Sequence, residues 1–201
     1  MGEGAARIGV FGGTFDPIHI GHLVAAVNVR HALELDSVLM VVAGEPWQKV
    51  GARPISPAED RFAMVAAAVE GVDGLEASRI EVDRPRPSYT ADTLEALLAE
   101  DPGVRLFLII GQDVADRLHT WKRPADVARL ATLVIVNRAV VGAAPPVDLP
   151  GWEVERVTIP PLAVSSSDLR GRASRGEPLD YLVPEAALRC IHERGLYAGG
   201  R

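Results

Sequence analysis

The chain has 201 residues, of which 48% are hydrophobic and 24% charged, and its formal net charge at pH 7 is -6. This composition is ordinary for a globular protein and the length suffices for one substantial core, so we expect a single domain over residues 1–201. The mildly acidic balance lacks the basic excess of nucleic-acid-binding or anionic-membrane-binding surfaces, which favours small-molecule partners over nucleic acid or membrane.

No apolar run in the sequence approaches the roughly 18 residues that a membrane-spanning helix needs. Residues 1–7 lack the apolar region of a secretory signal peptide. The expected location is therefore the cytoplasm. The single cysteine, Cys190, cannot form a disulfide within the chain, and we interpret it as a packing residue.

Short apolar runs bounded by turn residues alternate along the chain with segments of helical period. Strands are expected, in chain order, at residues 8–11, 38–42, 106–110 and 133–136, with an isolated strand candidate at 152–159. Helices are expected at residues 22–35, 57–70, 91–99, 114–118, 124–130, 167–174 and 184–194. The strand runs are almost continuously apolar, as is typical of parallel strands covered on both faces. The sequence therefore predicts an α/β fold with a doubly wound, mainly parallel, Rossmann-like sheet and a small helical C-terminal portion at about 160–201.

Two segments look irregular, residues 43–56, which carry glycines and prolines, and residues 84–88, which read Arg-Pro-Arg-Pro-Ser. Ligands of doubly wound folds bind beyond the carboxyl ends of the strands, where such loops lie. Both segments are therefore candidate active-site loops.

The most informative stretch follows the first strand and opens the first long helix, and it reads Gly-Gly-Thr-Phe-Asp-Pro-Ile-His-Ile-Gly-His over residues 12–22. Glycines at this position let the backbone approach a phosphate, which the following helix N-terminus also favours. His19 and His22 lie on one face of the first helical turn, so both imidazoles can meet one phosphate, and Gly21 keeps a side chain out of the way. Taken alone, such a pair could equally be solvated, cap the helix or bind a metal.

His19-Ile20-Gly21-His22, following Gly-Gly-Thr-Phe-Asp-Pro, resembles the HxGH signature of the nucleotidylyltransferase superfamily, and within it the nicotinate mononucleotide adenylyltransferases. Further landmarks follow in that family's order, at residues 46–49, 87–94, 110–113, 121, 138, 164–170 and 181–184. One departure is that Trp47-Gln48 stands where the family typically has Pro-His. That loop borders the acceptor pocket in the family, so the departure bears on the acceptor and leaves the chemistry unchanged.

The resemblance implies an enzyme that transfers the adenylyl group of ATP to nicotinate mononucleotide, giving nicotinate adenine dinucleotide and pyrophosphate in NAD biosynthesis. The acceptor phosphate attacks directly and in line; since its second pKa is near ~6, it is already ionised and needs no general base. Chemistry and resemblance together assign catalytic roles to His19, His22, Lys49 and Arg170. They assign ATP binding to Gly12, Gly13, Thr14, Phe15, Gly21, Gly111, Asp113, Ser166 and Ser167.

The acceptor, by the same resemblance, is bound by Tyr89, Thr90, Trp121 and Arg138. Taken alone, Trp121 could be a packing residue, and Tyr89 could simply close a hydrophobic loop. Mg²⁺ is expected to arrive with ATP, because no carboxylate cluster in the sequence would hold it alone, and no protein metal site is expected. The alternatives left open are an adenylyltransferase for nicotinamide mononucleotide or phosphopantetheine, and a nucleotide-binding regulatory module without turnover.

Overall fold

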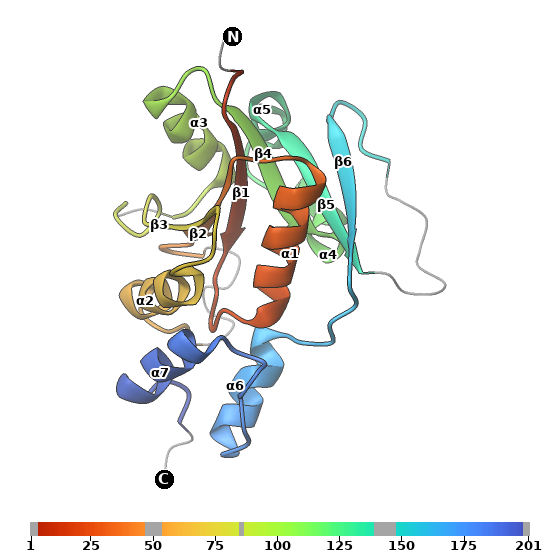
Figure 1. The fold of residues 1–201 in the computed structure, drawn as a ribbon. Coiled ribbons are helices and arrows are strands. Elements are labelled where there is room, and N and C mark those ends of the chain that lie inside the picture. Colours follow the sequence, from red (N-terminus) through yellow and green to blue (C-terminus); the bar gives the residue numbers. More distant parts are fainter. Residues whose placement is uncertain (1–3, 47–53, 85–86, 139–147, 199–201) are drawn as a thin grey trace.

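The computed structural model describes residues 4–46, 54–84, 87–138 and 148–198. Within these ranges the chain forms one six-stranded sheet in the order β3-β2-β1-β4-β5-β6, in which every neighbouring pair is parallel (Figure 1). The strands are β1 (Arg7–Gly13), β2 (Ser37–Val42), β3 (Leu75–Ser78), β4 (Arg105–Gly111), β5 (Thr132–Arg138) and β6 (Val154–Ile159).

Helices connect the strands and follow the last of them. They are α1 (Ile20–Ala32), α2 (Ala58–Val69), α3 (Thr90–Glu100), α4 (Gln112–Ala115), the 3₁₀ helix η2 (Leu118–Thr120), α5 (Pro124–Leu130), α6 (Ser166–Ser174) and α7 (Glu185–Glu193). No helix in the described ranges combines the length and the apolar character that crossing a membrane requires.

The sheet buries apolar side chains on both faces, which explains why its strands read as continuous apolar runs. In β4, Phe107 and Ile109 pack on one face with residues of α1, α2, α6 and α7. Leu106, Leu108 and Ile110 pack on the opposite face with residues of α3, α4 and α5. The doubly wound parallel fold expected from the sequence is therefore confirmed.

The direction of winding reverses between β1 and β4. The chain passes from β1 outward to β2 and β3, and then returns to β4 before continuing outward to β5 and β6. The connections after β1 and β4 leave in opposite directions from this point. A crevice therefore opens at the carboxyl ends of these two strands. The Gly-Gly end of β1 and Gly111 at the end of β4 therefore meet at the place where a doubly wound sheet binds its ligand.

The structure corrects several element predictions. The strand candidate at 152–159 is not isolated, because β6 pairs with β5 at the edge of the sheet. Strand β3 was not predicted, since Leu-Glu-Ala-Ser is short and only its leucine is buried. The helix expected at 114–118 is instead α4 followed by a separate 3₁₀ turn. The first helix begins at Ile20, because His19 has extended backbone angles and is the N-cap residue.

Candidate functional site

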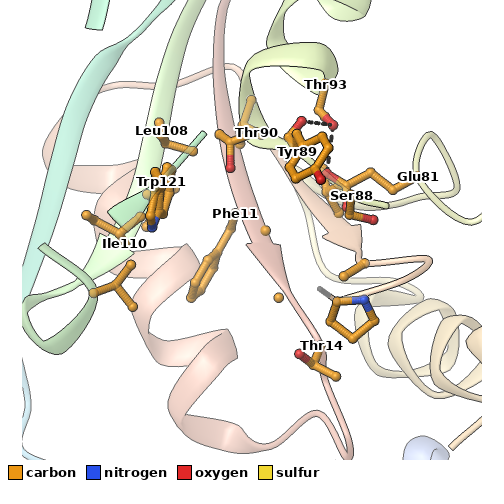
Figure 2. A pocket seen from close by; sticks show the side chains of 18 of the residues that line it. Phe11, Thr14, Glu81, Ser88, Tyr89, Thr90, Thr93, Leu108, Ile110 and Trp121 are labelled. Carbon is orange, nitrogen blue, oxygen red and sulfur yellow. Dashed lines mark hydrogen bonds between the residues drawn. The ribbon is translucent and has the colours of Figure 1, made fainter. Parts of the chain in front are cut away.

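A cavity of about 290 Å³ opens at the winding reversal. In Figure 2, Trp121 and Ile110 lie on one side of this cavity and Tyr89 and Glu81 on the other, with Phe11 between them. Predicted site residues from distant parts of the chain share its lining, namely Gly12, Gly13, Thr14, Tyr89, Thr90, Gly111 and Trp121. The structure therefore gathers the predicted phosphate loop and most of the predicted acceptor residues around one space.

The loop after β1 has a compact and buried form. Thr14, Phe15 and Asp16 are all buried, and Phe15 has a backbone φ of 49°, in the left-handed region that is uncommon for a residue with a side chain. The Phe15 ring packs edge-on against His22, with a centroid separation of 5.0 Å, and against Phe11 at 6.0 Å. The aromatic packing explains how this backbone conformation is held where the chain turns from strand to helix.

His19 and His22 form one unit at the start of α1. Their rings are stacked with centroids 3.7 Å apart, and Nδ1 of His22 accepts a 3.2 Å hydrogen bond from the backbone N–H of His19. Because Nδ1 of His22 is an acceptor here, the ring proton belongs on Nε2, which makes Nε2 the donor position of this imidazole. His22 also packs edge-on against Phe11, a cavity-lining residue, at 6.1 Å. Neither histidine is itself among the residues that line the cavity.

Gly21 lies between the two histidines, where the sequence predicted that it keeps a side chain out of the way. A Cβ at this position would come within 3.0 Å of the Val164 side chain and 3.1 Å of the His19 ring. Such contacts are tighter than side chains ordinarily make, so the glycine leaves room for the His19 imidazole and for the segment that leads into α6. It is not among the residues that line the cavity.

The predicted second phosphate element, at the start of α6, touches the first. Ser166 donates from Oγ to the carbonyl oxygen of Pro17 at 2.8 Å, and Arg170 donates from Nη1 to the carbonyl oxygen of Asp16 at 2.7 Å. Nη2 of Arg170 donates to Oγ of Ser167 at 3.1 Å, while Ser165 caps the helix by accepting from the Asp168 amide. The two elements are 149 to 154 residues apart in sequence and adjacent in space.

Arg61, on α2, donates hydrogen bonds to the loop after β1 from the protein interior, and no sequence pattern predicted it. It is 1% exposed, and its guanidinium donates to the carbonyl oxygens of Thr14, Ala43, Gly44 and Ser56 at 2.6 to 3.1 Å. One buried side chain thus joins the loop after β1 to the loop after β2. No local motif marks such an arginine, because its partners are backbone atoms of other segments.

Three of the four predicted acceptor residues come from two segments that face each other across the cavity. Tyr89 is the N-cap residue of α3 and Thr90 its first residue, whereas the half-buried Trp121 is the C-cap residue that follows η2. Arg123, two residues after Trp121, forms ion pairs with Asp92 and Glu95 of α3. These exposed pairs add little stability, but they link the two segments that carry the acceptor residues.

Glu81 belongs to the cavity wall and was not predicted. It is 9% exposed, and Oε1 accepts a 2.7 Å hydrogen bond from Oγ1 of Thr93. Burial raises the pKa of the Glu81 carboxyl, although hydrogen bonds from Thr93 and Ser88 oppose that effect. Ser88 in turn accepts from the Gly44 amide at 3.1 Å, so this buried carboxyl anchors the loop that leads to Tyr89. A single glutamate shortly before the irregular segment at 84–88 carried no signal that would have identified it.

Some predicted residues lie elsewhere. Asp113 is exposed on α4 and is not among the residues that line the cavity. Arg138 ends β5, and only its backbone is described. Lys49 and the Trp47-Gln48 departure lie outside the described residues. Lys122, which was not predicted, lines the cavity beside Trp121 and is exposed.

Known proteins match this chain over most of its length. The cytidylyltransferase-like family profile matches residues 10–172. A protein of Acidothermus cellulolyticus, named "Probable nicotinate-nucleotide adenylyltransferase", is 43% identical over 206 residues, covering 98% of each chain. One of Streptomyces coelicolor with the same name is 43% identical over 191 residues, covering 94% of this chain and 99% of its own.

A solved structure gives the corresponding comparison of folds. The Plasmodium falciparum nicotinic acid mononucleotide adenylyltransferase complexed with NaAD superposes with a TM-score of 0.78, covering 96% of this chain and 97% of its own. Its sequence is only 16% identical, so this likeness bears on the fold alone.

Proposed function

The chain belongs to the nicotinate-nucleotide adenylyltransferase family, within the cytidylyltransferase-like proteins, and on that premise we propose that its cavity binds ATP and nicotinate mononucleotide for direct adenylyl transfer. It is a nucleotidyltransferase of NAD biosynthesis, and the products of this reaction are nicotinate adenine dinucleotide and pyrophosphate. The observation that carries the proposal is that the phosphate loop, Tyr89, Thr90 and Trp121 line one cavity at the winding reversal of the sheet.

On the ATP side, the loop at residues 12–15 and the N-terminus of α1 receive the triphosphate. Backbone amides of Thr14 and Phe15 and the dipole of α1 favour the negative charge. Nε2 of His22, its proton fixed by the hydrogen bond at Nδ1, donates to the α-phosphoryl group as charge builds on its oxygens. Stacking against His19 holds the His22 ring in place for this contact.

The reaction needs positioning and charge stabilisation more than proton transfer. An oxygen of the acceptor phosphate forms the new bond to the α-phosphorus of ATP while the bond from that phosphorus to the bridging oxygen breaks, and pyrophosphate leaves with the electron pair. The attacking phosphate is already ionised near neutral pH, so no side chain has to act as a base. Ser167 and Arg170, at the start of α6 beside the loop after β1, bind the β- and γ-phosphates, since a helix N-terminus and a guanidinium both favour phosphate. By the family resemblance, Lys49 covers the phosphates as its loop closes.

On the acceptor side, the start of α3 favours a carboxylate. The first amides of a helix have no carbonyl partner within it, and they carry partial positive charge. Because α3 begins at Thr90 and both Tyr89 and Thr90 line the cavity, the nicotinate carboxylate binds at this N-terminus. The pyridine ring stacks on Trp121 across the cavity. A neutral carboxamide would gain less from the same helix end, which favours nicotinate over nicotinamide mononucleotide.

Mg²⁺ enters with the nucleotide, held by phosphate oxygens and water. In the part of the chain that the structure describes, no group of three or more His, Cys, Asp or Glu side chains could hold a metal ion. We assign the protein's own contacts with the phosphates to backbone amides, His22, Ser167, Arg170 and Lys49. We further propose that this biosynthetic reaction takes place in the cytoplasm.

Product identification tests the proposal. Purified protein is incubated with ATP, Mg²⁺ and nicotinate mononucleotide, and the products are separated and identified by mass spectrometry. Formation of nicotinate adenine dinucleotide together with an equal amount of pyrophosphate supports the proposal. Release of inorganic phosphate or AMP without the dinucleotide would contradict it.

A further inference from the structure

A tyrosine near the C-terminus reaches the phosphate loop. Tyr197 donates from its hydroxyl to Oδ1 of Asp16 at 2.7 Å, across 181 residues of sequence. Asp16 is 1% exposed and directly follows Phe15, whose amide we assign to the transferring phosphoryl group. Asp16 is not among the residues that line the cavity, so the contact is made on the protein side of the loop.

The segment that carries Tyr197 is firmly attached. Helix α7 packs against α2, and Ile191 lies in the core while Leu196 and Tyr197 pack against it. The Arg194 side chain forms an ion pair with Asp60 of α2, and the Leu196 amide donates to the Ile191 carbonyl at 3.0 Å. A hydroxyl on this segment therefore offers a fixed point to the loop.

Tyr197 contacts a different atom of the loop from the other donors. Arg61, Arg170 and Ser166 donate to the backbone carbonyls of Thr14, Asp16 and Pro17, respectively. Tyr197 donates to the carboxylate of Asp16. Burial raises the pKa of the Tyr197 phenol, so the hydroxyl keeps its proton and remains a donor at every pH at which the enzyme would work.

We propose that Tyr197 is a positioning residue for adenylyl transfer. Its hydroxyl holds the Asp16 carboxylate against the C-terminal segment, and this contact fixes the Thr14 and Phe15 amides against the transferring phosphoryl group. The inference rests on the proposed function. Donors aimed at developing charge act mainly in the transition state, and a small displacement of them lowers the rate more than the affinity. Loss of this contact should therefore lower kcat and leave both KM values nearly unchanged.

The test compares Tyr197→Phe with Tyr181→Phe. Tyr181 is 92% exposed and serves as the matched control for loss of one phenolic hydroxyl. With ATP and nicotinate mononucleotide, Tyr197→Phe should lower kcat roughly tenfold, with each KM within about twofold of wild type. Tyr181→Phe should leave kcat unchanged. Asp16→Ala, made alone and together with Tyr197→Phe, completes a double-mutant cycle.

The possible outcomes distinguish failure of the positioning role of Tyr197 from failure of the proposed function. If both residues act through one contact, adding Tyr197→Phe to Asp16→Ala should change kcat by less than about twofold. A kcat for Tyr197→Phe within twofold of wild type, or equal losses with and without Asp16→Ala, would overturn the positioning role, as would a change confined to KM. Should Tyr197→Phe fail to fold by circular dichroism, Asp16→Ala must show the same selective loss of kcat. Absence of the dinucleotide with wild-type protein would instead contradict the proposed function.

Discussion

Nδ1 of His22 accepts a hydrogen bond from the backbone N–H of His19, and the two imidazole rings stack with centroids 3.7 Å apart. One histidine thus sets both the orientation and the proton position of the other. The pair has an aromatic wall, because Phe11 and Phe15 pack edge-on against the His22 ring. A donor held in this way needs no rearrangement when charge develops on a bound phosphoryl group.

Removal of this donor should affect the rate strongly. We expect His22→Ala to lower kcat by roughly 10²- to 10³-fold, with a smaller change in the KM for ATP, because the contact strengthens in the transition state. His31→Ala is the matched control, since His31 lies exposed on the last turn of the same helix. Steady-state pyrophosphate release measures both variants. An unchanged kcat for a folded His22→Ala protein would refute the assigned role.

Replacement of Arg61 should destabilise the protein. Arg61→Met removes the donor to four buried or half-buried carbonyl groups, and each carbonyl left without a partner costs about 1–3 kcal/mol unless water replaces it. We expect a loss of about 3 kcal/mol in the free energy of unfolding, measured by urea denaturation. Arg129→Met, at a side chain 73% exposed, should change it by less than about 0.5 kcal/mol. Equal effects of the two substitutions would show that the buried contacts contribute nothing.

The Glu81 carboxyl should make stability depend on pH. Its pKa is raised in the folded protein, so between the ordinary pKa of glutamate and the folded value the native state binds more protons than the unfolded state. The contribution of this group to stability is then fully present at low pH and falls as pH rises through that window. Glu81→Gln removes the effect. Urea denaturation from pH 4.5 to 8 should therefore show the variant gaining stability relative to wild type as pH rises, whereas a difference independent of pH would count against the assignment.

Trp121 should determine acceptor affinity. We expect Trp121→Ala to raise the KM for nicotinate mononucleotide roughly tenfold, since stacking a ring on an aromatic side chain is worth about 1–3 kcal/mol, while the KM for ATP stays within about twofold. Trp152→Ala is the control, because Trp152 packs against the same face of the core but is not among the residues that line the cavity. Similar KM values for the two variants would indicate that Trp121 is only a packing residue.

Local patterns were sufficient to predict the four central strands of the sheet and the loop after β1. Buried parallel strands have continuous apolar runs, and the glycines and histidines of residues 12–22 follow one of them directly. Strand β3 was missed because it is short and only its leucine is buried. The pairing of β6 with β5 was missed because the residues of a strand do not indicate which strand it pairs with. The single-domain organisation and the residue roles remain predictions.

The residues that support the site could not be predicted from local sequence patterns. Arg61 holds backbone carbonyls that the chain brings together only on folding, and Tyr197 reaches Asp16 across most of the sequence. Glu81 shows a related limit, since its altered pKa depends on burial that composition does not reveal. Sequence motifs identified the groups proposed to meet the substrates, whereas the groups that hold them in place required the three-dimensional structure.

Acceptor preference is the most direct test of the account. Pyrophosphate release would be measured with ATP and Mg²⁺ and with nicotinate mononucleotide, nicotinamide mononucleotide or phosphopantetheine in separate reactions. We expect the highest kcat/KM with nicotinate mononucleotide, because its carboxylate would bind at the N-terminus of α3 beside Tyr89 and Thr90. An equal or higher kcat/KM with either of the other acceptors, or no release with any of the three, would contradict it.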